Sequence, residues 1–352
     1  MPVKKVLIVD DSATIRQLIR SIIADDTRLL VVGEAADPYE AREKIKTLNP
    51  DVLTLDVEMP RMNGLEFLEK LMRLRPMPVV MVSTETHKGS AAALEALSLG
   101  AVECIGKPRL KATAEAFWNL ADLLVAASTA RLRAAGPRPK LTPAAGFDWN
   151  GKIALVGSST GGVDALETLL SEFPENCPPT VITQHMPETF LASFAARLQR
   201  QIEPQLALAT PDAPLEQGRI YLAPGGAYHL ALARGEPARC TLVGEEKRSG
   251  HRPSVDVLFE SAQFLGDRAV GVLLTGMGRD GAEGMLKLRQ AGARCLAQDE
   301  ASSVVFGMPR AALETGGAER AVPLDAMARE VLALCTRQPP VAQRFVTRGR
   351  VV

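Results

Sequence analysis

Short apolar runs alternate with amphipathic stretches twice along this chain, and a segment with neither pattern separates the two series. In the first series, the stretches 14–24 and 65–75 have helical periodicity. Because strands that alternate with helices pair in parallel through crossovers, this pattern predicts a doubly wound α/β sheet. The five predicted strands are 6–9, 30–32, 52–55, 79–82 and 101–105.

A second strand–helix series begins near residue 149 and continues to about residue 337. It predicts another doubly wound, mostly parallel α/β domain. Helices are expected at 187–201, at 254–264 and from about residue 282. The predicted strands are 153–156, 180–183, 206–209, 219–222, 240–243, 269–274 and 294–297.

The segment 128–148 between the two series is rich in Ala, Pro and Arg and lacks apolar periodicity. This composition is typical of a linker, and a helix at 112–127 is expected to precede it. The chain is therefore expected to have four parts. These are a first domain at 3–125, a linker at 126–148, a second domain at 149–337 and a mildly basic tail at 338–352.

Composition excludes several classes of function. The formal net charge is zero, from 41 basic and 41 acidic side chains, and only 4% of residues are aromatic, so nucleic acid is not an expected partner. The five cysteines form no CxxC pair, which is typical of reduced thiols in a cytoplasmic protein and argues against a zinc site. We find no signal peptide and no apolar run near the roughly 18 residues of a membrane span, so membrane insertion is not expected.

Polar side chains stand where strands of the first series end. Asp10 and Asp11 follow the first strand, Asp56 the third, Ser83 the fourth and Lys107 the fifth. Such ends share one edge of a parallel sheet, where ligands bind. Three converging carboxylates repel one another unless a cation lies between them, and Mg²⁺ suits hard oxygen ligands and bridges to phosphate. The set predicts a site that holds a phosphoryl group, although any single aspartate is equally explained as a helix cap.

The motifs at this edge resemble the receiver domain of response regulators over about residues 3–122. They are VLIVDDS at 6–12, LDVEMP at 55–60, MNG at 62–64 and GKP at 106–108. The resemblance implies a flavodoxin-like fold and a chemotaxis histidine kinase as phosphodonor. The implied site residues are the phosphoacceptor Asp56, the Mg²⁺ ligands Asp10, Asp11 and Asp56, and the phosphate partners Ser83 and Lys107.

One position departs from the receiver pattern. Cys104 stands three residues before the lysine, where many receivers carry an aromatic residue that changes rotamer on activation. Signalling through such an aromatic rotamer change is therefore not expected in this chain.

A glycine-rich turn opens the second series. Residues 157–162 read GSSTGG between an apolar strand and a helical stretch, and they fit the G-x-S-x-G pattern that lifts one serine out of a strand-to-helix turn. Glycines permit the turn, and the helix N-terminus offers free N–H groups to negative charge. Ser159 is a candidate nucleophile. The same turn is also compatible with a phosphate cradle.

A nucleophilic serine needs a base and an acid that orients the base. Of four histidines, only His185 ends an apolar strand as Ser159 does, whereas His251 lies in a loop and His229 in an apolar segment. Asp280 follows the strand 269–274 through a glycine-rich turn and is the candidate acid, with a helix N-cap as its alternative role. The backbone N–H groups near Met277 and Gly278 are candidate oxyanion donors.

The second-domain motifs, taken as an ordered set, resemble the chemotaxis protein-glutamate methylesterase (CheB-type) family over about residues 150–337. The resemblance implies catalysis by Ser159, His185 and Asp280 without a cofactor. It implies demethylation, and often glutamine deamidation, of methyl-accepting chemotaxis receptors. Arg279, where an asparagine is common, is not expected to disable catalysis. The motifs are GSSTGG at 157–162, ITQHMP at 182–187, YLAPG at 221–225, HRPSVD at 251–256, LTGMG at 274–278, DGA at 280–282, QDEA at 298–301 and VFGMP at 305–309.

The pairing of a phosphoacceptor with an esterase suggests gating, in which the unphosphorylated first domain blocks the second. Three other interpretations stay open. In the first, the second domain binds a nucleotide without catalysis. Against it, Gln184 and His185 occupy the strand end where dinucleotide sites usually have an acid. In the second, the chain is a methylesterase that acts outside chemotaxis. In the third, the chain is a scaffold, which leaves the placement of the serine, histidine and aspartate unexplained.

Overall fold

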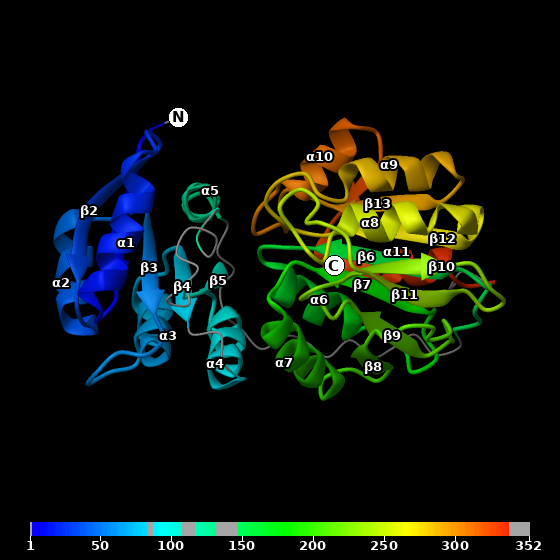
Figure 1. The fold of residues 1–352 in the computed structure, drawn as a ribbon, viewed down its shortest axis with the longest axis horizontal. Helices are drawn as coiled ribbons and strands as arrows, with labels where there is room; N and C mark the ends of the chain where they lie inside the picture. The colour runs from blue at the N-terminus through cyan, green and yellow to red at the C-terminus, as the bar shows by residue number, and fades with distance from the viewer. Residues whose placement is uncertain (1, 84–86, 108–116, 118, 131–146, 338–352) are drawn as a thin grey trace, which may run out of the picture.

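The computed structural model describes residues 2–83, 87–107, 117, 119–130 and 147–337. These residues form two parallel sheets, one in each half of the chain, and a separate antiparallel pair of strands. Helices cover both faces of each parallel sheet (Figure 1). The expected fold class, two doubly wound α/β domains in series, is confirmed.

The first domain has a five-stranded parallel sheet in the order β2-β1-β3-β4-β5. Its strands are β1 (Lys4–Val9), β2 (Leu29–Ala35), β3 (Val52–Asp56), β4 (Val79–Ser83) and β5 (Glu103–Gly106). Its helices are α1 (Ala13–Ala24), α2 (Pro38–Leu48), α3 (Gly64–Leu74), α4 (His87–Ser98) and α5 (Leu120–Ala127). Because every strand pair is parallel, all the strands end at the same edge.

Successive residues of β1 face opposite sides of this sheet, and both sides are buried. Val6 packs in one apolar cluster with Ile19 of α1 and Leu120 of α5. Leu7 packs in another with residues of α2, α3 and α4, including Phe67. A strand covered on both faces needs a continuous apolar run, which is why this strand was recognisable from the sequence.

The second domain has a seven-stranded parallel sheet in the order β14-β13-β12-β6-β7-β9-β8, and β10 pairs with β11 outside it. The strands are β6 (Ile153–Ser158), β7 (Thr180–Gln184), β8 (Gln205–Leu208), β9 (Arg219–Leu222), β10 (His229–Ala233), β11 (Arg239–Val243), β12 (Ala269–Leu273), β13 (Arg294–Gln298) and β14 (Arg320–Val322). The central strands β12, β6 and β7 are direct neighbours.

Helices cover the seven-stranded sheet on both sides. Val156 of β6 packs with α6 (Gly162–Leu170), α7 (Glu188–Gln199) and α11 (Leu324–Leu334). Leu155 packs on the other side with α8 (Val255–Ser261), α9 (Ala282–Gln290), α10 (Met308–Glu314) and the β10–β11 pair. None of the described helices is both long enough and apolar enough to span a bilayer.

The structure differs from the sequence expectations at a few elements. Strands β10 and β14 are not among the predicted strands, and β14 has only three residues. The predicted helix at 254–264 ends at Ser261, and the 3₁₀ segment η1 (Gln263–Arg268) follows, with Gly266 at a φ of 57°. Of the predicted helix at 112–127, Phe117 and Asn119 lie in a turn before α5. Most of the expected linker and the whole tail lie outside the described residues.

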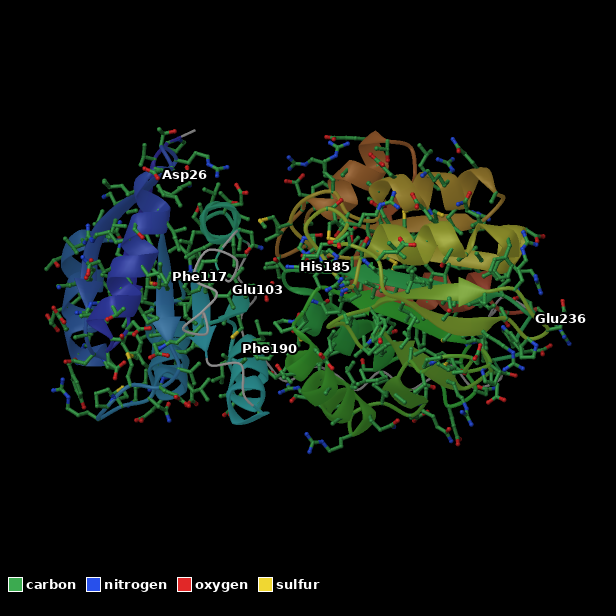
Figure 2. All side chains as sticks on the ribbon, viewed as in Figure 1. Asp26, Glu103, Phe117, His185, Phe190 and Glu236 are labelled. Carbon is green, nitrogen blue, oxygen red and sulfur yellow. The ribbon has the colours of Figure 1, made fainter. Side chains whose placement is uncertain are left out.

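The two domains meet through the β4–β5 side of the first sheet. Helix α4 packs against α7 and α6, and α4 lies beside α7 in Figure 1. The largest apolar cluster of the described residues passes through this contact, from Leu94 and Leu97 of α4 to Phe190 and Phe194 of α7. Glu103 of the first domain and His185 of the second are brought to the two sides of the same boundary (Figure 2). The contact is therefore apolar beside α4 and polar beside β5.

Candidate active site and phosphoacceptor site

Ser159 lies in a tight turn between β6 and α6. Gly161 has a φ of 77°, which an L side chain rarely adopts. A Cβ on Gly162 would lie 2.1 Å from Gln184 Oε1, and a Cβ on Gly276 would lie 2.8 Å from the Ser159 Cβ. The glycines are thus required by the conformation and by close approach, and they hold Ser159 against neighbouring loops.

Gln184, the last residue of β7, ties this turn to the next strand end. The Ser158 hydroxyl donates to Gln184 Oε1 at 2.5 Å, and Gln184 Nε2 donates to the carbonyl oxygens of Ser159 at 3.0 Å and His185 at 3.1 Å. Both sides of the amide are engaged within the protein. The side chain therefore fixes the positions of Ser159 and His185 relative to each other.

His185 and Asp280 form a direct pair although 95 positions separate them. His185 Nε2 lies 2.7 Å from Asp280 Oδ2, and only 2% of the Asp280 side chain is exposed. Asp280 also accepts hydrogen bonds from the Ser254 hydroxyl at 2.8 Å and from the Val255 N–H at 2.7 Å. The carboxylate thus lies at the N-terminus of α8, where free N–H groups stabilise negative charge.

The electrostatics of this pair favour an ionised carboxylate. Burial by itself raises the pKa of Asp280, but the hydrogen bond and charge of His185, with the donors of Val255 and Ser254, hold it below its usual value. Because Nε2 of His185 faces Asp280, its other nitrogen is left for the serine. Nδ1 is buried and has no hydrogen-bond partner among the described residues. The ring is therefore arranged to accept a proton at Nδ1.

The two candidate oxyanion residues differ in position. Met277 lines the pocket at Ser159, whereas Gly278 is exposed and is not among the lining residues. The N–H groups of Ser159 and Gly276 already donate to the carbonyl oxygens of Thr275 and Val305. Of the two, only Met277 borders the pocket.

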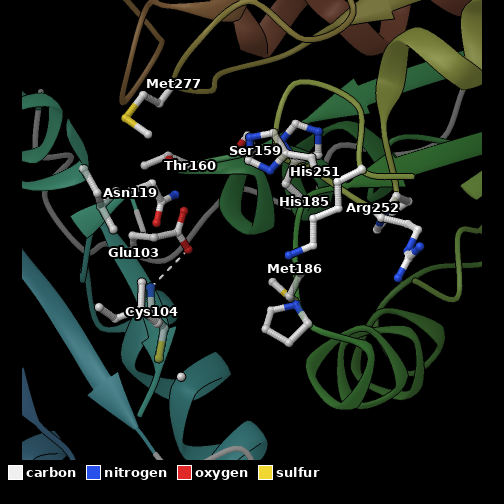
Figure 3. Close-up of a pocket in the computed structure, with 17 residues that line it drawn as sticks. Glu103, Cys104, Asn119, Ser159, Thr160, His185, Met186, His251, Arg252 and Met277 are labelled. Atoms are coloured by element: carbon white, nitrogen blue, oxygen red, sulfur yellow. Dashed lines mark hydrogen bonds between the residues drawn. The ribbon is translucent and has the colours of Figure 1, made fainter. Parts of the chain in front are cut away.

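A pocket of about 280 Å³ lies over Ser159 and is lined by both domains (Figure 3). The second domain contributes the active-site residues and the loop around His251. The first domain contributes the four residues of β5, Glu103–Gly106, together with Asn119 and Leu123. The first domain therefore covers the active site of the second.

Glu103 stands at the centre of this covered region. Its carboxyl accepts the N–H of Cys104 at 3.0 Å and a hydrogen bond from the Thr160 side chain, next to the serine. Loss of water raises the pKa of Glu103 to about 7, although these two bonds and the charge of His185 act in the opposite direction. A carboxyl with this pKa changes charge near neutral pH.

The predicted carboxylate edge also forms. Lys107 Nζ lies 3.0 Å from Asp10 Oδ2 and 2.8 Å from Asp56 Oδ2, and both aspartates are 1% exposed. Ligand oxygens of Asp10, Asp11 and Asp56 all lie within 4.8 Å of one another. Ser83 ends β4 opposite Gly106 in the sheet, but its side chain is outside the described residues.

Burial dominates the charges at this edge. It raises the pKa of Asp56 to about 6, against the opposing effect of Lys107, and it raises the pKa of Asp10. These two oxygens, Oδ2 of each residue, accept no hydrogen bond of good geometry and have only the ion pairs with Lys107. Three close carboxylates, of which Asp10 and Asp56 are buried and Asp11 is exposed, are a donor set that fits Mg²⁺.

Known proteins resemble the chain over nearly its whole length. The CheB methylesterase family matches residues 154–331. A protein-glutamate methylesterase/protein-glutamine glutaminase 1 from Caulobacter vibrioides is 56% identical over 337 residues, which cover 94% of this chain and 98% of the relative. A protein of the same name from Rhizobium johnstonii is 54% identical over 334 residues, with 94% and 96% coverage. The chain belongs to the CheB methylesterase family.

Two further comparisons address the halves of this CheB family member. The response regulator receiver domain family matches residues 6–115. The crystal structure of the Thermotoga maritima CheB methylesterase catalytic domain is 35% identical, with a TM-score of 0.51, and covers 53% of this chain and 99% of that one. The chain is thus an enzyme of the CheB methylesterase family with an N-terminal receiver domain.

Sequence reasoning missed several residues that shape the CheB-type site. The sequence indicates Gln184 only as the end of a strand and does not indicate Ser254 as a partner of Asp280. His251 was assigned only to a loop, but its ring stacks on His185 with centroids 3.8 Å apart. The position of Gln184 between a predicted strand and the candidate histidine His185 could have identified it as a site residue. Nothing in the sequence placed Ser254 beside Asp280, 26 positions away, or His251 beside His185, 66 positions away.

The pH dependence of stability tests the burial of Asp56. Its folded pKa of about 6 exceeds the value of 3.8 in an unfolded chain, so the native state binds more protons and the free energy of unfolding falls as pH rises from about 4 to 6. Asp56→Asn is expected to remove this slope and to raise the free energy of unfolding at pH 7, by up to about 3 kcal/mol at 1.36 kcal/mol per pKa unit. Urea unfolding at several pH values measures both effects.

Asp11→Asn is the matched control, because Asp11 belongs to the same cluster but is exposed. It is expected to leave the slope between pH 4 and 6 nearly unchanged. An equal effect of the two substitutions would contradict the assignment of the slope to buried Asp56.

Proposed function

We propose that this chain hydrolyses methyl esters of glutamate side chains in proteins and deamidates glutamine side chains. The observation that carries the proposal is the 2.7 Å pair of His185 and Asp280 beside the Ser159 turn, at the edge where β12, β6 and β7 end. The relatives named protein-glutamate methylesterase/protein-glutamine glutaminase support the same activity. In this proposal Ser159, His185 and Asp280 are nucleophile, base and orienting acid.

The proposed reaction has two steps. Ser159 Oγ attacks the ester carbonyl while His185 Nδ1 takes the hydroxyl proton, and methanol leaves with that proton as the acyl-serine forms. Water then attacks the acyl-serine, gives a proton to Nδ1 and releases the glutamate carboxylate, with the serine reprotonated. With a glutamine amide the leaving group is ammonia. Asp280 stabilises the imidazolium in both steps. Because it binds Nε2, it leaves Nδ1 directed toward Ser159.

The tetrahedral oxyanion is proposed to accept from backbone N–H groups at the Met277 turn. One such donor commonly lowers a barrier by about 3 kcal/mol. Gly278, also a candidate, is the less favoured donor because it lies outside the pocket lining.

The proposed substrates are methyl-accepting chemotaxis receptors, and the proposed phosphodonor is a chemotaxis histidine kinase. Both come from the family to which the chain belongs. The proposed location is the cytoplasm, which agrees with five buried cysteines that are all free thiols. We propose the same division into domains, linker and tail that the composition suggested, at 3–125, 126–148, 149–337 and 338–352.

Substitution of the serine tests the nucleophile. Ser159→Ala is expected to lower methanol release from methyl-labelled receptor membranes at least about 10³-fold, because no other hydroxyl takes its place. Ser158→Ala is the matched control and is expected to lose far less, since Ser158 only donates to Gln184. Full activity in Ser159→Ala would overturn the assignment.

We propose that Asp56 accepts the phosphoryl group. Asp10, Asp11 and Asp56 would hold Mg²⁺, which when bound supplies charge neutralisation for the phosphoryl oxygens. Lys107, now shared between Asp10 and Asp56, is the proposed cationic partner of the phosphate, and Ser83 is the proposed hydroxyl partner. The ester chemistry of the second domain needs no cofactor in this proposal.

We propose further that the unphosphorylated receiver inhibits the esterase by covering it. The pocket over Ser159 is closed on one side by β5 and α5, and the apolar α4–α7 contact holds that cover in place. A receptor helix is too bulky for a space of about 280 Å³. Phosphorylation of Asp56, at the end of β3, would loosen the contact and expose the serine.

Separation of the domains tests this inhibition. Residues 147–352 alone are expected to release methanol faster than the unphosphorylated full chain, because the cover is gone. The fragment is a reasonable unit, since a relative's catalytic domain forms a structure by itself. A phosphodonor should raise the rate of the full chain and not that of Asp56→Asn. A fragment no faster than the full chain would contradict inhibition by the receiver.

The Glu103 carboxyl makes the inhibition pH-dependent. Its pKa is about 7 in the covered state and near 4.5 when the carboxyl is solvated, so deprotonation between these values weakens the cover as pH rises. The ratio of full-chain to fragment rate is expected to increase from pH 5 to 7, and Glu103→Gln should flatten it. Glu95→Gln, an exposed position on α4, is the control and should retain the increase. A flat ratio for the unsubstituted chain would contradict this role.

A further inference from the structure

We propose that His251 is a positioning residue for the hydrolytic reaction, whose ring holds the His185 imidazole in the plane that directs Nε2 to Asp280 and Nδ1 to Ser159. The inference deepens the proposed function and rests on it. The two rings are parallel within 7°, and their centroids are 3.8 Å apart. Figure 3 shows them as neighbours in the wall of the pocket.

A stack matters here because His185 has few other restraints on its ring. Its Nε2 bond to Asp280 fixes one direction, and Nδ1 has no hydrogen-bond partner among the described residues. One hydrogen bond leaves rotation about the bond axis and tilt of the ring unrestrained. A flat ring against one face of the imidazole restricts both motions. Nδ1 therefore stays directed toward Ser159 before substrate binds.

The loop that carries His251 is itself anchored. The His251 N–H donates to the Arg248 carbonyl oxygen at 2.9 Å, and the Arg248 N–H donates to the His251 carbonyl oxygen at 3.0 Å. The guanidinium of Arg248 makes two 2.6 Å bonds to Glu260 of α8. Arg252 donates to the carbonyl oxygens of Gly226 and Glu245. A ring mounted on this loop can act as a fixed surface.

The same loop leads directly into the group that holds Asp280. Three residues after His251, the Ser254 hydroxyl donates to Asp280, and the next N–H, from Val255, does so as well. One short segment therefore fixes both the carboxylate that pairs with His185 and the face on which the His185 ring lies. This continuity favours a role in orientation over an accidental contact.

The charge state of His251 suits a stacking surface. Burial and the neighbouring His185 lower the pKa of His251 to about 3, with a further lowering by Lys247 and an opposing effect of Asp280. Glu103, on β5 of the receiver, also interacts with the charge of His185. A ring that stays neutral presents a π face to the imidazolium that forms when His185 takes the serine proton, and a cation over a π face is favourable.

Substitution of His251 in the full chain, with receptor membranes and a phosphodonor, tests the inference. His251→Ala removes the surface, His251→Leu keeps apolar volume without a π face, and His251→Phe keeps a flat π face that cannot titrate. We expect His251→Ala and His251→Leu to lower kcat about tenfold with KM changed less than twofold. We expect His251→Phe to regain at least a third of the wild-type kcat, with the acid limb of its pH profile where the wild type has it.

The outcomes separate the inference from the proposed function. If His251→Phe is as slow as His251→Ala, or if its acid limb moves, His251 acts through its nitrogens and the inference is wrong. If His251→Leu is as fast as His251→Phe, volume alone explains the contact and the inference is also wrong. If the wild type releases no methanol, or Ser159→Ala releases it as fast as the wild type, the proposed function fails instead. Circular dichroism of each variant shows whether it has folded.

Discussion

The buried carboxylate of Asp280 is the interaction on which the active site depends. An ionised group with 2% exposure is costly unless donors surround it, and here a hydroxyl and backbone N–H groups at the start of α8 supply them together with His185. These bonds join three loops that follow β7, β12 and the β11 strand. The geometry of the histidine, and with it the reactivity proposed for Ser159, follows from where this carboxylate is held.

A second constraint is that both domains share one pocket. The receiver contributes Glu103 and its neighbours on β5 to the wall opposite Ser159, and the apolar packing of α4 on α7 fixes that wall. A change at Asp56 acts on the same sheet, two strands from β5 and joined to it through Lys107. The phosphoacceptor site at Asp56 and the pocket over Ser159 are therefore linked through paired strands and packed helices.

Much of this was predictable because parallel sheets leave a clear pattern. Each buried strand needs a continuous apolar run, and polar residues just after such runs meet at one edge. Asp10, Asp56 and Lys107 converge as expected, and so do His185 and Asp280. Short elements leave a weaker pattern, which is why β14, with three residues, was missed.

The sequence by itself determined the fold class, the two sheet edges and the residue types placed there, because local periodicity and turn chemistry act over a few positions. The tertiary structure decided which nitrogen of His185 faces Asp280, that Gln184 ties two strand ends together, and that His251 lies flat on His185. It also decided that Glu103 faces the active site. These features depend on contacts between loops far apart in the chain, whose relative positions are set only when the sheets, helices and domains pack.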